Sequence, residues 1–149
     1  MSLQNRLQDD LKKAMIERDK VRKNVIRFVR SVIHDREIER KQTLDDESVI
    51  DVLGKQAQQR RDSIEAFEQG NRPELVAKEK AELDVILEYL PKQLTEDEVR
   101  KIVLKAIEGF ELTGPKDMGK VMATVMPELK GRAEGKTVSS IVMQLLNSV

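Results

Sequence analysis

The chain has 149 residues, and its 27 basic and 27 acidic side chains give a formal net charge of zero. It contains no cysteine, which excludes disulfides, thiolate nucleophiles and metal sites built on sulfur. Charged residues make up 36% of the sequence and aromatic residues only 3%, a composition that favours packed helices over a β-sandwich or a β-barrel.

Two helices are expected before residue 42. Ser2 can cap the first helix, because its side chain can accept a hydrogen bond from a free amide of the first turn. Asp19 can open a second helix that runs to about Lys41. One side of this second helix should be buried, since it carries an apolar stripe of Val21, Val25, Phe28, Val29, Val32 and Ile33.

Two more helices are expected up to residue 91. The acids of Thr43–Glu47 suit the first turn of a third helix, where negative charge is favourable, and Gly70–Asn71 ends it. Pro73 suits the first turn of a fourth helix, which Pro91 terminates. No segment alternates apolar and polar residues over the length of a strand, so we expect no sheet.

A domain boundary is expected at Pro91, because Thr95–Glu98 has the pattern of a capping box that starts a new helix. Three short helices should follow: Thr95 to about Gly109, Lys116 to about Met126 before Pro127 interrupts it, and Thr137 to Leu146. We therefore predict an all-α protein. Residues 1–91 should form an N-terminal domain of about four helices, and residues 92–149 a smaller three-helix tail domain.

Residues that carry enzyme chemistry are scarce. His34 is the only histidine and lies in a charged helical stretch, so it predicts neither a metal site nor a catalytic triad. Gly114–Val121 has the spacing of a phosphate-binding loop, but Val121 stands where the loop needs a hydroxyl. In Gly131–Thr137 the glycines are one residue too close. We expect no catalytic residue, no metal, no cofactor and no turnover of ATP or glutamine by the chain alone.

A secretory signal and a membrane span are both missing from the sequence. Met1–Arg6 lacks an apolar run behind a basic start. No stretch approaches the roughly 18 apolar residues that a membrane helix needs. We therefore expect a cytoplasmic protein.

The neutral total conceals an uneven distribution of charge. Residues 1–41 hold 12 basic and 7 acidic side chains, whereas residues 42–91 hold 6 basic and 12 acidic ones. A cationic end beside an anionic middle fits either a face that binds a polyanion or helices that attract each other when packed.

Six side chains form a basic row on the expected second helix. At 100° per residue they fall within about 80° of its circumference, away from the apolar stripe, and they span about 30 Å. A row of this length can follow a polynucleotide backbone, and the scarcity of aromatic residues favours a structured RNA. The alternative is a solubilising face or a contact for the acidic middle segment. The row consists of Lys20, Lys23, Arg27 and Arg30, our candidates for RNA binding, with His34 and Lys41.

The tail offers a second set of RNA-binding candidates: Lys120, Lys130, Arg132 and Lys136. Glycines in the basic loop of Lys130, Arg132 and Lys136 let a backbone approach a phosphate closely, and the free amides of a helix that begins near Thr137 favour an anion. The alternative is that Gly131 merely ends a helix and that Glu134 offsets part of the charge.

Five stretches of the sequence carry a family resemblance: Gln59–Phe67, Glu79–Leu83, Tyr89–Pro91, Asp117–Met122 and Lys130–Lys136. They are similar to the YqeY-like family, also called the GatB/YqeY domain family. The last two resemble the tail domain of the B subunit of the tRNA-dependent Asp/Glu-tRNA amidotransferase. Glu134 stands where an aspartate is expected, which preserves the acid.

The resemblance implies a helical domain and a smaller helical tail, which in the amidotransferase helps to hold tRNA while other domains do the chemistry. It favours a non-catalytic tRNA-binding or tRNA-handling module. It also associates the chain with carbon–nitrogen ligases that use glutamine as amido donor. Two alternatives stay open: an accessory component of such a ligase, acting only with amidotransferase partner subunits, and a protein-binding adaptor.

Overall fold

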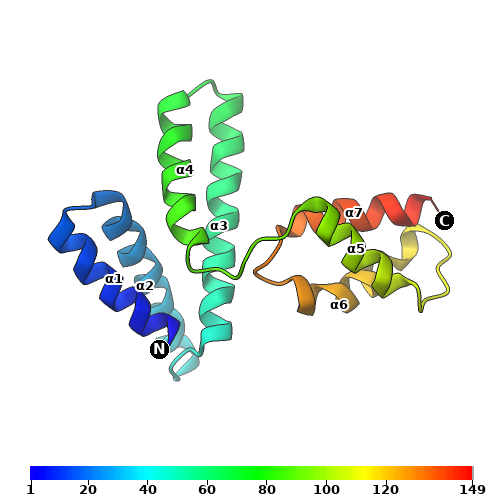
Figure 1. The fold of residues 1–149 in the computed structure, drawn as a ribbon, viewed down its shortest axis with the longest axis horizontal. Helices are drawn as coiled ribbons and strands as arrows, with labels where there is room; N and C mark the ends of the chain where they lie inside the picture. The colour runs from blue at the N-terminus through cyan, green and yellow to red at the C-terminus, as the bar shows by residue number, and fades with distance from the viewer. Residues whose placement is uncertain (149) are drawn as a thin grey trace. The chain divides into compact units, whose positions relative to one another are not determined.

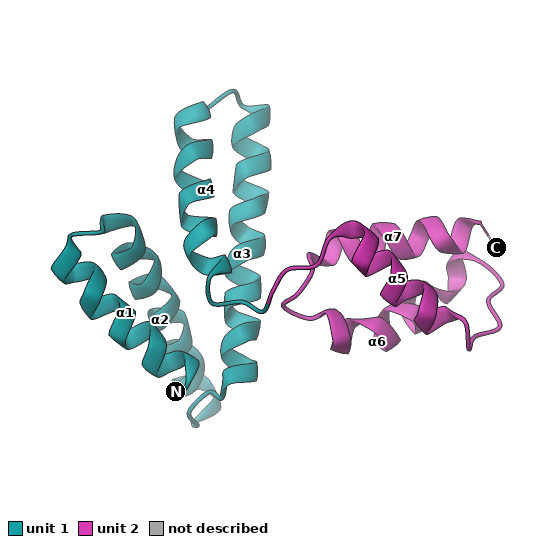
Figure 2. Cartoon of the chain, viewed as in Figure 1, with its two compact units in different colours: residues 1–91 teal, residues 92–149 magenta. Residues whose placement is uncertain are grey.

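The computed structural model describes residues 1–148, and these residues form seven α-helices and one short 3₁₀ helix without any strand (Figure 1). The prediction of an all-α protein is therefore confirmed. The chain divides into two compact units, residues 1–91 and residues 92–149 (Figure 2). Each unit has an apolar core of its own.

Helices α1 (Leu3–Glu17) and α2 (Lys20–Arg40) form the first hairpin (Figure 1). Ser2 and Asp19 cap them as expected, since each side chain accepts a hydrogen bond from the amide three residues later. Arg18, between the helices, has a left-handed φ of 59°, and its amide bonds back to the last turn of α1. This residue closes α1 and lets α2 begin almost at once.

Helices α3 (Asp46–Gln69) and α4 (Pro73–Leu87) form a second hairpin (Figure 1). Asp45 caps α3 by accepting a hydrogen bond from the Ser48 amide, and Pro73 is the first residue of α4. α4 ends at Leu87 rather than at Pro91, and the proline itself disfavours helical geometry only in the preceding residue, Leu90.

The core of residues 1–91 gathers at one end of the α3–α4 hairpin. The buried residues of α3 all lie between positions 49 and 57, and α4 contributes Val85 and Ile86. No side chain from residue 58 to residue 84 is fully buried, so the far half of this hairpin contributes no residue to the fully buried core. The first hairpin completes the core with Leu7, Leu11, Val25, Ile26, Val29 and Ile33.

The buried side of α2 differs from the expected stripe. Val21 and Phe28 are exposed, whereas Ile26, which the stripe left out, is fully buried. Its position on the apolar stripe assigned Phe28 to the core. In the structure its ring lies at the surface, where the Arg60 guanidinium covers it at 5.5 Å from the ring centroid.

Residues 92–149 contain α5 (Glu96–Ile107), η1 (Pro115–Asp117), α6 (Met118–Leu129) and α7 (Gly135–Asn147). The expected capping box opens α5, since the side chains at both of its ends bond to the opposite backbone amide. The three α-helices enclose a core of Val99, Val103, Val121, Val125, Leu129, Val138, Ile141, Val142 and Leu146.

The bounds of α6 and α7 differ from the predictions. α6 begins at Met118, two residues after the expected Lys116, because η1 occupies Pro115–Asp117. α6 continues through Pro127 to the fully buried Leu129. Pro127 lies in the last turn, where its missing amide deprives only the carbonyl of the exposed Ala123 of a helical partner. α7 begins at Gly135, two residues earlier than expected, so Lys136 is helical.

Trypsin should cut the native chain first after Lys92. This residue is exposed and lies between α4 and α5, outside any helix. Beyond it the chain is held, since the Gln93 side chain donates to the Gly131 carbonyl and the Leu94 amide to the Arg132 carbonyl. Limited proteolysis followed by mass spectrometry checks this. First cuts inside α2 or α4 would contradict a boundary at residue 91.

Candidate nucleic-acid interface

The basic row on α2 carries positive charge that no ion pair in the described chain neutralises. Two of the three α2 arginines outside the row behave differently: Arg22 pairs with Glu88, and Arg36 with Asp51. The row's RNA-binding candidates are exposed, except for one that is half-buried. They are the exposed Lys20, Arg27 and Arg30 and the half-buried Lys23.

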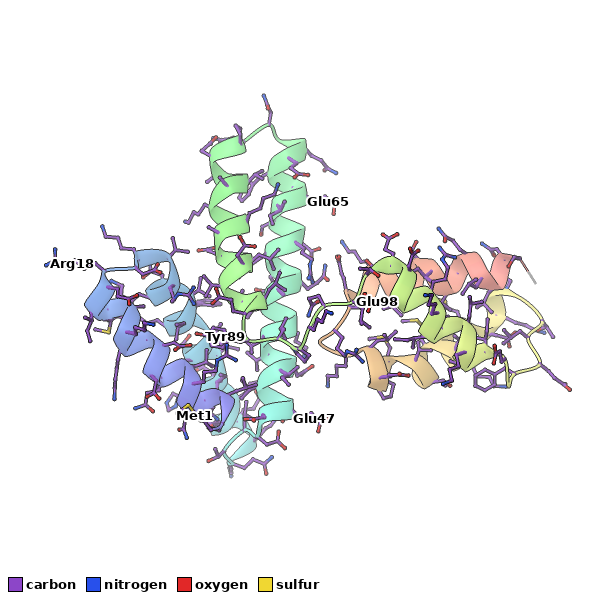
Figure 3. The ribbon with its side chains drawn as sticks, viewed as in Figure 1. Met1, Arg18, Glu47, Glu65, Tyr89 and Glu98 are labelled. Atoms are coloured by element: carbon purple, nitrogen blue, oxygen red, sulfur yellow. The ribbon has the colours of Figure 1, made fainter. Side chains whose placement is uncertain are left out.

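A hollow of about 240 Å³ lies where α1 turns into α2. Three members of the row, Lys20, Lys23 and Arg27, line it together with Met15 and Arg18. Figure 3 shows the Arg18 side chain at the end of α1, pointing away from the helices. Four basic side chains thus line one small volume, mostly through their carbon atoms, and no acidic residue lines it. We call this site the turn hollow.

The other half of the row has a different setting. Arg30 and His34 line a separate hollow of about 400 Å³ between α1 and α2, which Glu37 also lines. Hydrogen bonds from the Gln4 side chain and from the Leu44 amide lower the pKa of the Glu37 carboxyl. This carboxylate offsets the cations beside it, so the row is purely cationic only toward the start of α2.

In the tail, Lys130 and Arg132 flank Gly131 in the connection between α6 and α7. Gly131 has a φ of 76°, a backbone conformation that favours glycine. Gln93 Nε2 donates to the Gly131 carbonyl at 2.7 Å, and the Leu94 amide donates to the Arg132 carbonyl at 2.8 Å. The two cations are therefore presented from a fixed backbone.

The other two tail candidates lie apart from this connection. Lys120 lies in the first turn of α6, about 15 Å away along the helix. Its ammonium group lies 4.9 Å from the centroid of the Phe110 ring. Lys136 lies in the first turn of α7 and lines a hollow of about 380 Å³ with Arg100. The structure groups Lys130 with Arg132 but does not bring Lys120 to them.

Sequence reasoning missed Arg18 and Arg100. Arg18 has a left-handed backbone, so a helical projection of α2 cannot place it beside Lys20 and Lys23. The signal that could have found it is the cap at Asp19, which requires a turn immediately before α2. Arg100 lies on α5 and donates a hydrogen bond to the Gln144 side chain of α7, a pairing visible only in the folded tail.

Charged residues from two of the family stretches form a cluster within the first unit. The Nε atom of Arg60 lies 3.3 Å from an Oε atom of Glu82 and 3.7 Å from one of Glu79. These side chains are only 13%, 19% and 17% exposed. Burial raises the pKa of the Glu79 carboxyl, and the charge of Glu82 raises it further. The cluster joins α3 to α4 and, through the Phe28 ring, to α2.

The Tyr89–Pro91 stretch holds the end of α4 against the first hairpin. The Tyr89 hydroxyl donates a hydrogen bond to the Asp10 carboxylate of α1, and the Arg6 guanidinium lies 4.6 Å from the centroid of its ring. Figure 3 shows Tyr89 close to α2. Burial and the Asp10 carboxylate raise the pKa of Tyr89. These contacts give the stretch a structural role.

The Gly114–Val121 motif, which has the spacing of a phosphate-binding loop, lies at the start of a helix. Gly114, with a φ of 137°, precedes η1, and Val121 lies in α6.

Among residues 1–148 no cluster of three or more His, Asp or Glu side chains is arranged to hold a metal ion. Within the same residues no helix is both long and apolar enough to cross a bilayer.

Curated relatives match most or part of the chain. "Altered inheritance of mitochondria protein 41, mitochondrial" from Pyrenophora tritici-repentis is 35% identical over 146 residues, which cover 96% of this chain and 80% of the relative. Proteins of the same name from Saccharomyces cerevisiae and Lachancea thermotolerans are 44% identical over 85 residues, or 56% of this chain. That match spans 46% of these two relatives, about half of their length.

The relatives contradict the expected cytoplasmic location, since their names place them in mitochondria. The expectation rested on a missing secretory signal and a missing membrane span. Neither absence distinguishes the cytoplasm from another aqueous compartment, so these two features could not support a cytoplasmic location.

The family resemblance seen in the sequence is confirmed at the level of the whole chain. The family model described as "Yqey-like protein" matches residues 4–146, which include all seven helices of the described structure almost completely. The relative from Pyrenophora tritici-repentis aligns over nearly the same extent. The chain belongs to the YqeY-like family.

Proposed function

We propose that this chain is a non-catalytic module that binds tRNA through two basic surfaces, the row on α2 and the connection between α6 and α7. The row carries the proposal, because its cations form no ion pair within the described residues while Arg22 and Arg36 on the same helix are paired. Cations without an intramolecular ion pair can bind phosphates and release the counterions that surround a nucleic acid.

Two further features support a structured RNA as the ligand. Only 3% of the residues are aromatic, which disfavours a platform for stacking many single-stranded bases. Both basic surfaces have fixed backbones, one in a helix and one in a hydrogen-bonded connection, and such surfaces suit the regular phosphate spacing of a folded RNA. The likeness of the tail stretches to the amidotransferase tail supports tRNA among structured RNAs.

Removing cations from either surface should weaken tRNA binding and flatten its dependence on salt. Each lost phosphate contact lowers the slope of log affinity against log salt by roughly one, so a double substitution lowers it by about two. The variants are Lys23→Ala with Arg27→Ala for the row, and Lys130→Ala with Arg132→Ala for the tail. Binding is measured by gel shift at salt concentrations from about 50 mM to about 200 mM.

A matched control removes the same charge elsewhere. Lys101→Ala with Lys105→Ala takes two exposed cations from α5 and should leave the salt slope within error of the parent. If both row and tail variants bind tRNA like the parent, the RNA proposal loses its physical basis, and a protein-binding adaptor takes its place.

A second candidate is an accessory component of a glutamine-dependent carbon–nitrogen ligase. The likeness of Asp117–Met122 and Lys130–Lys136 to the amidotransferase tail favours it. Co-purification of this chain with amidotransferase subunits from native lysate supports this candidate. Retention of those subunits after ribonuclease treatment separates it from a link made only by shared tRNA.

A further inference from the structure

We infer that the turn hollow receives one unpaired nucleotide of a folded RNA, with the phosphate beside Lys20 and Lys23 and the base stacked on the Arg18 guanidinium. This inference rests on the proposed function, since it names the feature of the RNA that the row on α2 selects. It concerns a separate property, which is preference for an RNA with an unpaired end over one that is fully paired.

The composition of the hollow sets the chemistry of its occupant. Four basic side chains and one methionine line the hollow, mostly through their carbon atoms, and no acidic side chain belongs to it. Its volume of about 240 Å³ equals that of about eight water molecules in the liquid, so it can take more than a bare ion. A ligand with an anionic group and a larger, partly apolar group fits both features.

The two arginines favour a planar group for the second part of that ligand. A guanidinium is flat and weakly hydrated, and unpaired RNA bases stack on it as they do on aromatic rings. Arg18 and Arg27 line the hollow from the turn and from α2, respectively. Met15 adds a polarizable apolar surface that is 49% exposed in this structure. The hollow can therefore hold a base without any aromatic residue.

The backbone that presents Arg18 is fixed before a ligand arrives. The Arg18 amide bonds back to the last turn of α1, and the Asp19 amide donates to the Ala14 carbonyl at 2.9 Å. Binding therefore costs less ordering of the main chain than it would at a mobile loop. Since Lys23 and Arg27 belong both to the hollow and to the row, a nucleotide in the hollow is continuous with a backbone that follows α2.

The test compares two RNA hairpins that share one stem, one blunt and one with a short unpaired 3′ overhang. The parent should bind the overhang hairpin more tightly by roughly two- to fivefold, the range of a cation–π contact at a partly exposed site. Arg18→Lys keeps the charge but removes the planar group, so this affinity ratio should fall toward one. Arg18→Gly, which suits the left-handed φ of 59°, should also abolish the preference.

A fluorescent base reports the stacking directly. With 2-aminopurine in the overhang, binding to the parent should change its emission, and binding to Arg18→Lys should not. Arg40→Lys makes the same chemical change at an exposed position at the far end of α2 and should behave like the parent. A preference that survives Arg18→Lys, or a parent that binds both hairpins equally, overturns the inference while leaving the proposed function intact. A parent that binds neither hairpin nor tRNA overturns both.

A lipid surface is the competing occupant, because the neighbouring Ile16 is 82% exposed. Vesicles of phosphatidylcholine and phosphatidylserine test it by co-sedimentation. Binding that Ile16→Ser abolishes, without any preference between the hairpins, would assign the α1–α2 turn to a membrane surface and overturn the nucleotide assignment. Absence of vesicle binding together with a preference for the overhang hairpin supports the nucleotide assignment.

Discussion

Replacing Leu53 by alanine should lower the free energy of unfolding of residues 1–91 by about 2–5 kcal/mol. Leu53 is fully buried on α3 and belongs to the first core. The truncation removes apolar contacts and leaves a cavity that the helices fill only in part. Because the two units have separate cores, we expect amide hydrogen exchange to accelerate in residues 1–91 and to stay unchanged in α5, α6 and α7.

The reciprocal substitution provides the matched control. Leu129→Ala empties the equivalent fully buried position in the second core and should accelerate exchange in residues 92–149 alone. Both variants are measured in the full-length chain by NMR. If either substitution accelerates exchange equally in both halves, the chain unfolds as one cooperative unit, and the predicted boundary at residue 91 is wrong.

Much of the fold could be predicted because the ends of the helices depend on local chemistry. Ser2, Asp19 and Thr95 each cap the helix that follows them, and a cap needs only residues within the same turn. The end of α6 could not be predicted in this way. Burial of Leu129 in the tertiary core outweighs the local effect of Pro127, so the helix extends past the proline.

The candidate site was predictable only where it lies on one regular element. The projection of α2 correctly places Lys20, Lys23 and Arg27 on one face, because helix geometry alone decides that angle. The same projection places Glu37 within about 20° of Arg30, because seven residues make almost two full turns, so the acid beside that end of the row was visible in the sequence. The α1 residues that complete that hollow were not. The turn hollow as a whole depends on Arg18, which lies outside both helices.

Replacing Arg60 by methionine should destabilise residues 1–91 by about 2–3 kcal/mol at neutral pH. The substitution keeps an apolar stem against Phe28 but leaves Glu79 and Glu82 close together without their shared cation. Removing one partner of a fully buried ion pair costs about 3–5 kcal/mol of stability. We expect a smaller loss here because the side chains of the cluster are partly exposed to solvent. Chemical denaturation of the full-length chain measures the change.

A surface ion pair gives the matched comparison. Arg72 lies 3.7 Å from Glu74 at the turn of the second hairpin, and both side chains are more than 60% exposed. Arg72→Met should therefore cost no more than about 1 kcal/mol. Equal losses from Arg60→Met and Arg72→Met would show that burial of the Arg60 cluster contributes nothing to the stability of the fold.

The loss caused by Arg60→Met should shrink as the pH falls. The pKa of Glu79 already lies above its ordinary value of 4.5, because burial and Glu82 disfavour its charged form while Arg60 favours it. Without Arg60 this pKa rises further, so the folded variant takes up a proton at a higher pH than the unfolded chain does. Protonation relieves the repulsion between the two carboxylates as the pH falls through the raised pKa toward 4.5. The denaturation midpoints of parent and variant should therefore converge as the pH falls from neutral toward 4.5. A constant difference between the midpoints would mean that Arg60 stabilises the fold through its contact with Phe28 and not through its charge.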